Sequence, residues 1–404
     1  MLCVCPVYLP IGGVSARAVF PLLLVAFFPS YFFKKSIFLL LFGATYLLLG
    51  FVSSQTDPDI RRLVSPPLFM LYFAGVFTLF VRFGSGFVTD LYSVGRFLVI
   101  LSLVVPITTI IFRFAPGLEA SYMDSGVASI FVNSNNIAKY ALGGTNIQQS
   151  AKAGGYLFAN GNWSATFCFV LLCCSQIFFF RSSSIAKLAF AVVFLLGVLA
   201  SGSKTPFFLL PLVVAVEVGI RTTSKGSRPV IVLFRLLMIA LVVFITMVLF
   251  ERVLYALSGV NTFVTRVELW QLSLSGLSDY WLLGGGVDYW DNRVVDNGGV
   301  RYYRVSIPPH NFFLATIMVS GVFPLSCLIL FVFHRIRETF YVRTRGHTKF
   351  STVSSAWVLA AVTWVMLHSM LSNITIFGDY AIAIPLALLL ALTHTEHARL
   401  YTER

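Results

Sequence analysis

One segment of the chain carries residues suited to proton transfer. His310 and Asn311 directly follow two prolines and begin an apolar run that ends at Ser320, just before Gly321. A neutral imidazole at a membrane surface can take a proton from a hydroxyl group as its oxygen attacks an electrophile. An isolated histidine at a helix start is more often structural, so the neighbouring residues matter. The polar segment before it carries five arginines: Arg252, Arg266, Arg293, Arg301 and Arg304.

A predicted helix within this polar segment holds a cation and an aromatic ring on one face. Residues 264–277 have helical character, and Arg266 and Trp270 lie one turn apart. A guanidinium binds phosphate oxygens through two parallel hydrogen bonds and keeps its charge. The indole of Trp270 offers a flat apolar face for a sugar ring. The alternative is an Arg/Trp pair that anchors a helix at the membrane surface.

A third candidate is the Ser201-Gly202-Ser203-Lys204 sequence between two apolar runs. It predicts a tight outward turn with a cation at the start of a helix. Lysine close to hydrocarbon costs a few kcal/mol, which favours an anionic partner such as a phosphate. A lysine that extends its amine to the membrane surface is the alternative.

Asp57 and Asp59, with Pro58 between them, form a rival site in the first outward loop. Some membrane glycosyltransferases of a different architecture use an acidic residue in this position as base or metal ligand. An Asp-Pro turn between two helices explains the same residues.

Composition sets the class of protein. Of the 404 residues, 58% are hydrophobic and 11% are charged, against about 25% charged in soluble domains. The formal charge of +13 does not indicate a nucleic-acid partner, because the basic residues are spread over short loops. The cysteines show neither a disulfide framework nor a metal-binding spacing. We therefore expect an all-α, polytopic integral membrane protein, with no metal and no cofactor.

The apolar runs predict about 11 (10–12) transmembrane helices. The expected spans are 18–33, 36–52, 66–83, 97–115, 156–180, 186–200, 205–220, 230–250, 309–333, 352–372 and 379–393. Basic loops at Lys34–Lys35, 181–187, 221–228 and 335–349 indicate the cytoplasmic side. Two long, nearly neutral loops then face outward.

These features predict five regions. Residues 1–115 form the first transmembrane helices and residues 116–155 the first outward loop. Central helices follow over 156–250. Residues 251–308 form the large outward loop with site residues, and 309–404 hold the last helices and a cytoplasmic tail. A glycine triplet at 284–286 and the Asn297-Gly298-Gly299 sequence predict sharp turns in the large loop.

Several of these motifs together resemble those of bacterial O-antigen ligases and O-antigen polymerases. The resemblance covers about residues 150 to 330. It rests on the sequence Gly155-Tyr156-Leu157-Phe158-Ala159-Asn160-Gly161-Asn162, Ser201–Lys204, Thr265-Arg266 with Trp270, Leu283–Gly286, and His310-Asn311 with Gly321. Gly161 stands where that family usually has proline, and Lys204 where it usually has arginine. Pro324 replaces the usual small residue or tyrosine.

The resemblance implies an enzyme of the bacterial inner membrane with its site at the periplasmic face. It would move a glycan from undecaprenyl pyrophosphate to a sugar hydroxyl, without metal and with inversion at the anomeric carbon. His310 would deprotonate the acceptor, while Arg266 and Lys204 hold the pyrophosphate. Trp270, Asn311, Arg301, Arg304 and Asn162 are further candidates for contact with the substrate. A chain-length regulator is a possible partner.

Alternatives stay open at this stage. A polymerase and a ligase, which attaches the glycan to lipid A-core, share these motifs, and we favour the polymerase because no feature marks a lipid A-core surface. A polysaccharide flippase predicts mid-membrane cations and quasi-symmetric halves; here the charges lie near the outer surface. A transferase with a lipid-monophosphate donor would use Asp57 or Asp59.

Overall fold

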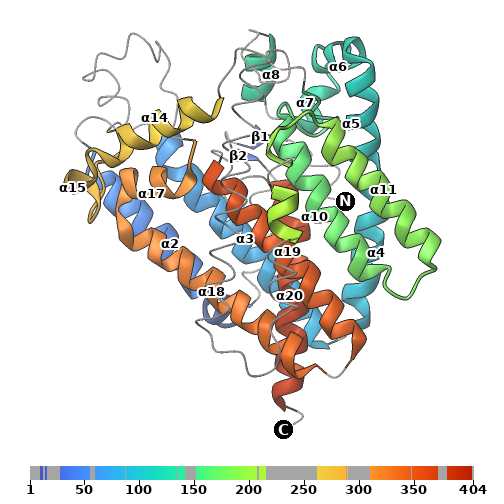
Figure 1. The fold of residues 1–404 in the computed structure, drawn as a ribbon. Helices are drawn as coiled ribbons and strands as arrows, with labels where there is room; N and C mark the ends of the chain where they lie inside the picture. The colour runs from blue at the N-terminus through green and yellow to red at the C-terminus, as the bar shows by residue number, and fades with distance from the viewer. Residues whose placement is uncertain are drawn as a thin grey trace.

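The chain folds into a bundle of helices, shown in Figure 1. A computed structural model describes residues 10–11, 14–15, 28–54, 60–86, 88–132, 134–141, 152–206, 209–214, 262–287, 289, 310–346, 348–371 and 380–402. Long apolar helices satisfy their own backbone polar groups, which is what a lipid environment requires. The protein is an all-α, multi-pass membrane protein, as the composition predicted.

The first half of the chain holds a short strand pair and several helices. Strand β1 (Pro10–Ile11) pairs antiparallel with β2 (Val14–Ser15). The helices are α2 (Pro29–Val52), α3 (Ile60–Gly86), α4 (Val88–Leu101), α5 (Val104–Phe114), α6 (Pro116–Met123), α7 (Ala128–Phe131) and α8 (Ser134–Ala141). The expected outward loop 116–155 is therefore largely helical in its first part.

The rest of the chain, from residue 152 on, contributes the other helices. They are α10 (Gly161–Phe178), α11 (Ser184–Ala200), α14 (Thr262–Leu274), α15 (Leu277–Tyr280), α17 (Phe312–Ser320), α18 (Val322–Arg345), α19 (Lys349–Leu371) and α20 (Tyr380–Thr402). The expected span 230–250 lies outside the described residues, as does most of the first expected span.

Within the described residues, six helices are long and apolar enough to cross a membrane. They are Pro29–Val52, Leu63–Gly84, Leu91–Phe114, Gly161–Phe178, Phe350–Leu371 and Tyr380–Thr402, and α11 is a shorter apolar helix. The expected number of eleven spans is not confirmed.

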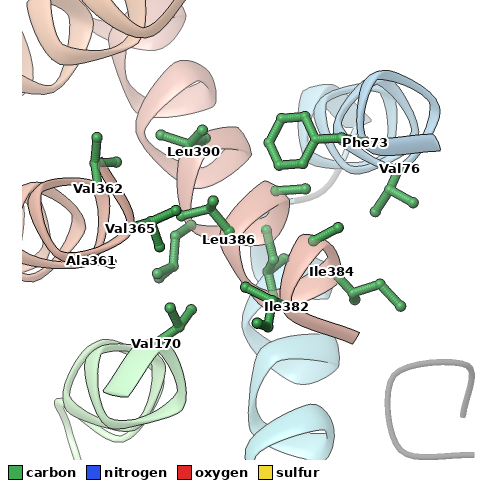
Figure 2. Packing of buried hydrophobic residues seen from close by; sticks show 14 of the residues in the cluster. Phe73, Val76, Val170, Ala361, Val362, Val365, Ile382, Ile384, Leu386 and Leu390 are labelled. Atoms are coloured by element: carbon green, nitrogen blue, oxygen red, sulfur yellow. The ribbon is translucent and has the colours of Figure 1, made fainter. Parts of the chain in front are cut away.

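Helix α20 lies at the centre of the bundle and packs against α3, α4, α10, α18 and α19. Figure 2 shows this core from close by: Phe73 of α3, Val170 of α10 and Val365 of α19 meet Leu386 and neighbouring residues of α20. Side chains of α10 and α20 are buried almost throughout. These two helices are therefore surrounded by other helices, whereas α2 exposes apolar residues on one side.

The predicted loop at Lys34–Lys35 is wrong. Both lysines lie inside α2, which runs without a break from Pro29 to Val52. The Nζ atom of Lys35 lies 2.9 Å from His394 Nε2, although the two residues are 359 positions apart. A long-range polar contact thus accommodates a lysine that a local reading of the sequence assigns to a loop.

That contact belongs to a buried charged network. Arg335 and Glu338 of α18 form an ion pair at 2.8 Å, and His394 Nδ1 lies 2.9 Å from Glu338 Oε1. The network places the start of α2 and the second halves of α18 and α20 at one end of the bundle. The predicted grouping of these basic residues on one side is therefore compatible with the fold.

The expected single span 309–333 is also wrong, because the chain breaks at Gly321. Gly321 has a φ of 76°, and a Cβ atom there would collide with the carbonyl oxygen of Leu282. Only glycine adopts this conformation at such close approach without strain. The segment that approaches Gly321 is the chain after α15.

Candidate functional site

His310 occupies an unusual backbone conformation at the start of α17. Its φ is 48°, and it is the single non-glycine residue with positive φ in the described part of the chain. A left-handed histidine costs on the order of 1 kcal/mol, so the surrounding structure must hold it. Such strain is concentrated at functional sites. The side chain is half-buried rather than fully exposed.

Asn311 fixes the start of α17. Its side-chain oxygen accepts hydrogen bonds from the backbone N–H groups of Phe313 at 3.0 Å and Leu314 at 3.2 Å. It is an ordinary helix N-cap and is buried. Its amide oxygen is therefore occupied by the helix, and a role in substrate contact stays a prediction.

The glycine-rich segment fixes the other end of α17. The N–H of Gly285 donates to Met318 O at 2.7 Å, and that of Gly286 donates to Val319 O at 3.1 Å. Carbonyl groups in the last turn of a helix otherwise lack partners. The sharp turn predicted for the triplet is present, and it binds the large loop to the helix that follows His310.

Arg266 and Trp270 lie one turn apart on α14, as predicted, and both are half-buried. Helix α14 packs on α17 through a cluster of Leu269, Tyr280 and Met318. Since Met318 belongs to the helix that His310 precedes, this packing sets the position of Arg266 relative to His310. The apolar contact and the hydrogen bonds of the glycine-rich segment both hold the large loop against α17.

The Ser201–Lys204 turn follows the end of α11, and its hydroxyl groups hold it in place. Ser201 Oγ accepts from the N–H of Ser203 at 3.2 Å. Ser203 Oγ accepts from the N–H of Thr205 at 3.3 Å and donates to Asn162 Oδ1 at 2.6 Å. The small polar residues therefore orient the turn that carries Lys204. Asn162, predicted to touch substrate, is buried and holds this turn.

A lysine that the sequence analysis did not select lies beside the same turn. The N–H of Ala153, which follows Lys152, donates to Ser201 O at 3.0 Å. A Cβ atom at position 161 would lie 2.5 Å from Ser201 O and 2.9 Å from the Cβ of Lys152. Gly161 therefore allows three chain segments to meet at the start of α10. Glycine is required here because a side chain would collide with the Ser201 carbonyl oxygen and with Lys152.

The segment that carries Lys152 is held from its other side by Glu119 of α6. Glu119 is buried, and its Oε1 accepts a hydrogen bond from the N–H of Gly154 at 2.8 Å. Burial raises the pKa of this carboxyl to about 7, and hydrogen bonds from Gly154 and Gly155 oppose the rise. The segment that we expected to form the first outward loop thus supports the site.

The charges show that these segments converge. Burial, together with the smaller effect of the nearby charges of Arg266 and Lys152, lowers the pKa of His310 to about 4. Burial, Arg266 and Lys204 together lower the pKa of Lys152 to about 8. Arg266 and Lys152 thus lie close to a histidine that stays neutral at ordinary pH, and Lys204 lies close to Lys152. Like charges in a partly buried site favour an anionic ligand.

A second histidine lies near this cluster. His368 of α19 is completely buried, and Arg266 and Lys152 are close enough to act on it electrostatically. Its Nδ1 atom bonds to the hydroxyl of Thr166, which also accepts from Trp364 Nε1 at 3.2 Å. Its Nε2 has no hydrogen-bond partner within the described residues. The sequence analysis did not select His368, although an ionisable residue inside an apolar span often indicates a functional site.

The other sequence candidates, Arg301 and Arg304 and the rival pair Asp57 and Asp59, lie outside the described residues. The turn at 297–299 also lies outside them. The structure places Arg266 near His310, and Lys152, which the sequence analysis did not select, lies near both of them and near Lys204.

The fold and the site define a multi-pass membrane protein with a cationic cluster at one end of its helices. A family model described as O-antigen ligase matches residues 189–329. This stretch includes Lys204, Arg266 and His310, and the match confirms the predicted resemblance. It supports the similarity of the chain to an O-antigen ligase/polymerase family, whose members are glycosyltransferase-type enzymes. No curated protein sequence matches the chain.

Proposed function

We propose that the protein transfers a glycan from undecaprenyl pyrophosphate to a sugar hydroxyl at the periplasmic face of the inner membrane. The observation that carries this proposal is the closeness of Arg266 and Lys152 to the neutral imidazole of His310, with Lys204 beside Lys152. The match to the O-antigen ligase family supports a lipid-linked glycan as the donor. We also propose the division of the chain into transmembrane helices (1–115, 156–250 and 309–404, the last with a cytoplasmic tail) and two periplasmic loops (116–155 and 251–308).

In the proposed reaction, the acceptor hydroxyl oxygen attacks the anomeric carbon of the donor sugar. The bond from this carbon to the pyrophosphate oxygen breaks, and His310 takes the hydroxyl proton. The leaving pyrophosphate gains negative charge, which Arg266, Lys204 and Lys152 stabilise from fixed positions. A single displacement of this kind inverts the anomeric configuration and needs no metal.

We further propose that the acceptor is the end of another lipid-linked glycan, as in a polymerase. Ligation to lipid A-core is the second candidate, and the description of the matching family favours it. A strain without the gene separates them. Lipopolysaccharide with core and a single repeat indicates a lost polymerase. Bare core with accumulated lipid-linked polymer indicates a lost ligase, and an unchanged lipopolysaccharide pattern contradicts both.

The pH dependence follows from the two perturbed groups. His310 acts as a base when neutral, which holds above its pKa of about 4. Lys152 assists when protonated, which holds below its pKa of about 8. We expect kcat/KM, which reports groups of the free enzyme, to be nearly constant between these values and to fall above the higher one.

A matched variant tests whether the fall in kcat/KM at alkaline pH is caused by deprotonation of Lys152. Arginine keeps its charge over the whole range, so Lys152→Arg should move the fall in kcat/KM to higher pH. The measurement is the initial rate of glycan transfer at low donor concentration as a function of pH. An unchanged alkaline limb in Lys152→Arg would show that Lys152 does not act in the reaction.

The hydrogen bond from Ser203 to Asn162 predicts a positioning role. Asn162→Ala leaves the buried Ser203 hydroxyl without its acceptor, which costs about 1–3 kcal/mol and disturbs the turn that carries Lys204. We expect transfer to slow by roughly tenfold, since about 1.4 kcal/mol corresponds to one decade. The matched variant is Ser203→Ala. If the pair acts as a unit, Asn162→Ala has little further effect in that background. Fully additive losses would contradict the role.

A further inference from the structure

A cavity of about 560 Å³ lies at the far end of α10 from the candidate site. Helix α10 begins at Gly161, beside Lys152, and ends at Phe178, which lines the cavity. Its 18 residues correspond to about 27 Å at 1.5 Å per residue, close to the thickness of about 30 Å of a bilayer's hydrocarbon. The cavity therefore lies at the membrane surface opposite the site.

Three arginines from separate parts of the chain line this cavity. Arg96 lies on α4, Arg181 in the turn after α10, and Arg399 near the end of α20. Glu396, the one acidic residue among the described residues of the lining, pairs with Arg399 at 3.0 Å. Three positive charges and one negative charge leave the lining with a net charge of +2. The cavity is thus an electropositive site.

The position of Arg96 is well defined. Its Nε atom donates a hydrogen bond to Phe178 O at 2.9 Å. Its guanidinium lies 5.9 Å from the centroid of the Phe179 ring, within the range of a cation–π contact. These contacts hold the planar group while its remaining N–H groups can serve an oxyanion. Guanidinium groups held in this way suit phosphate recognition.

The rest of the lining combines aromatic rings with hydroxyl groups. The ring of Tyr92 contacts those of Phe178 at 5.9 Å and Phe350 at 5.4 Å between centroids. Thr348 and Ser351, whose hydroxyl oxygens lie 2.7 Å apart, also border the cavity. A ligand that fits must present an anionic group to the arginines and carbon to the rings.

We propose that this cavity binds a phosphate ester, carried either by an anionic phospholipid of the adjacent leaflet or by a soluble molecule. The charge, the hydroxyl groups and the aromatic wall fit the glycerol phosphate portion of such a lipid. Arg96 and Arg181 bind the phosphate, since Arg399 is already paired with Glu396. The proposal is independent of the transfer reaction and of its substrate.

The test uses the full chain in nanodiscs of phosphatidylcholine with a minor share of phosphatidylglycerol. Native mass spectrometry measures how much phosphatidylglycerol stays bound after extraction. We expect the double variant Arg96→Gln/Arg181→Gln to retain roughly tenfold less than the wild type, because two charge-assisted contacts are lost. Arg181→Gln alone, on an exposed residue, should show a smaller loss and cannot disturb the contact between Arg96 and Phe178.

The matched control is Arg337→Gln, which removes an exposed arginine of α18 outside the cavity lining. It should retain the lipid as the wild type does. Equal retention in all variants, or an equal loss in Arg337→Gln, overturns the proposal.

A second arm separates the two sources of phosphate. Glycerol 3-phosphate is titrated against protein in nanodiscs of phosphatidylcholine alone, and the heat of binding is measured. Binding that the double variant loses supports a soluble ligand, and retention of phosphatidylglycerol without such binding supports a lipid. If neither ligand binds to the wild type, the proposal fails.

Discussion

Replacement of His310 by asparagine is expected to lower the transfer rate by roughly 10²- to 10⁴-fold, the usual contribution of a positioned base. Asparagine tolerates the left-handed backbone that His310 adopts, but its amide cannot take a proton at ordinary pH. The loss should therefore appear in the rate and not in folding. The measurements are glycan transfer by purified protein and thermal unfolding of the same sample.

His368 provides the discriminating control for this prediction. It lies buried near the same cations and is the other histidine of the site region that could act as a base. If His310→Asn retains activity and His368→Asn loses it, the proposed base is the wrong one. His310→Gly, which removes the backbone strain together with the imidazole, should unfold no more easily than the wild type and still be inactive.

The second large effect is expected at Arg266. Arg266→Ala should slow transfer by roughly 10²- to 10³-fold, as loss of one fixed donor to a developing charge does in other enzymes. Because the charge on the leaving pyrophosphate grows in the transition state, kcat should fall more than KM rises. Arg266→Lys keeps the charge but loses the bidentate geometry, and we expect an intermediate rate.

Two comparisons make the prediction specific. Arg113→Ala removes an exposed arginine near the end of α5, outside the cation cluster, and should leave the rate unchanged. The double variant Arg266→Ala/Lys204→Ala should lose less than the product of the single losses, because both cations act on one group. A rise in KM with an unchanged kcat would show that Arg266 only binds the ground state.

The sequence predicted those parts of the site whose structure depends on residues close together in the chain. Arg266 and Trp270 lie on one face of α14 because four residues make about one helical turn. The glycine triplet forms the sharp turn expected of it. The Ser201–Lys204 turn also follows from residue type, since its hydroxyl groups replace backbone partners. Motif order then indicated the family that the comparison supports.

The errors arise where a distant partner decides the local structure. A pair of lysines predicts a loop, yet Lys35 remains in α2 because His394 contacts it. An unbroken apolar run predicts one helix, yet Gly321 ends α17 because residues 282–286 occupy the space beside it. Lys152 was missed for the same reason. Its place in the site depends on Ser201 and Glu119, which no local pattern connects to it.

Helix α17 has one further consequence for the chemistry. Asn311 terminates it on one side and the N–H groups of Gly285 and Gly286 terminate it on the other. Each residue of a helix turns the chain by about 100°. A helix with both ends held cannot gain or lose a residue without rotating the imidazole away from the cations. The orientation of the His310 side chain is thus determined by the length of α17, because both ends of this helix are fixed by hydrogen bonds.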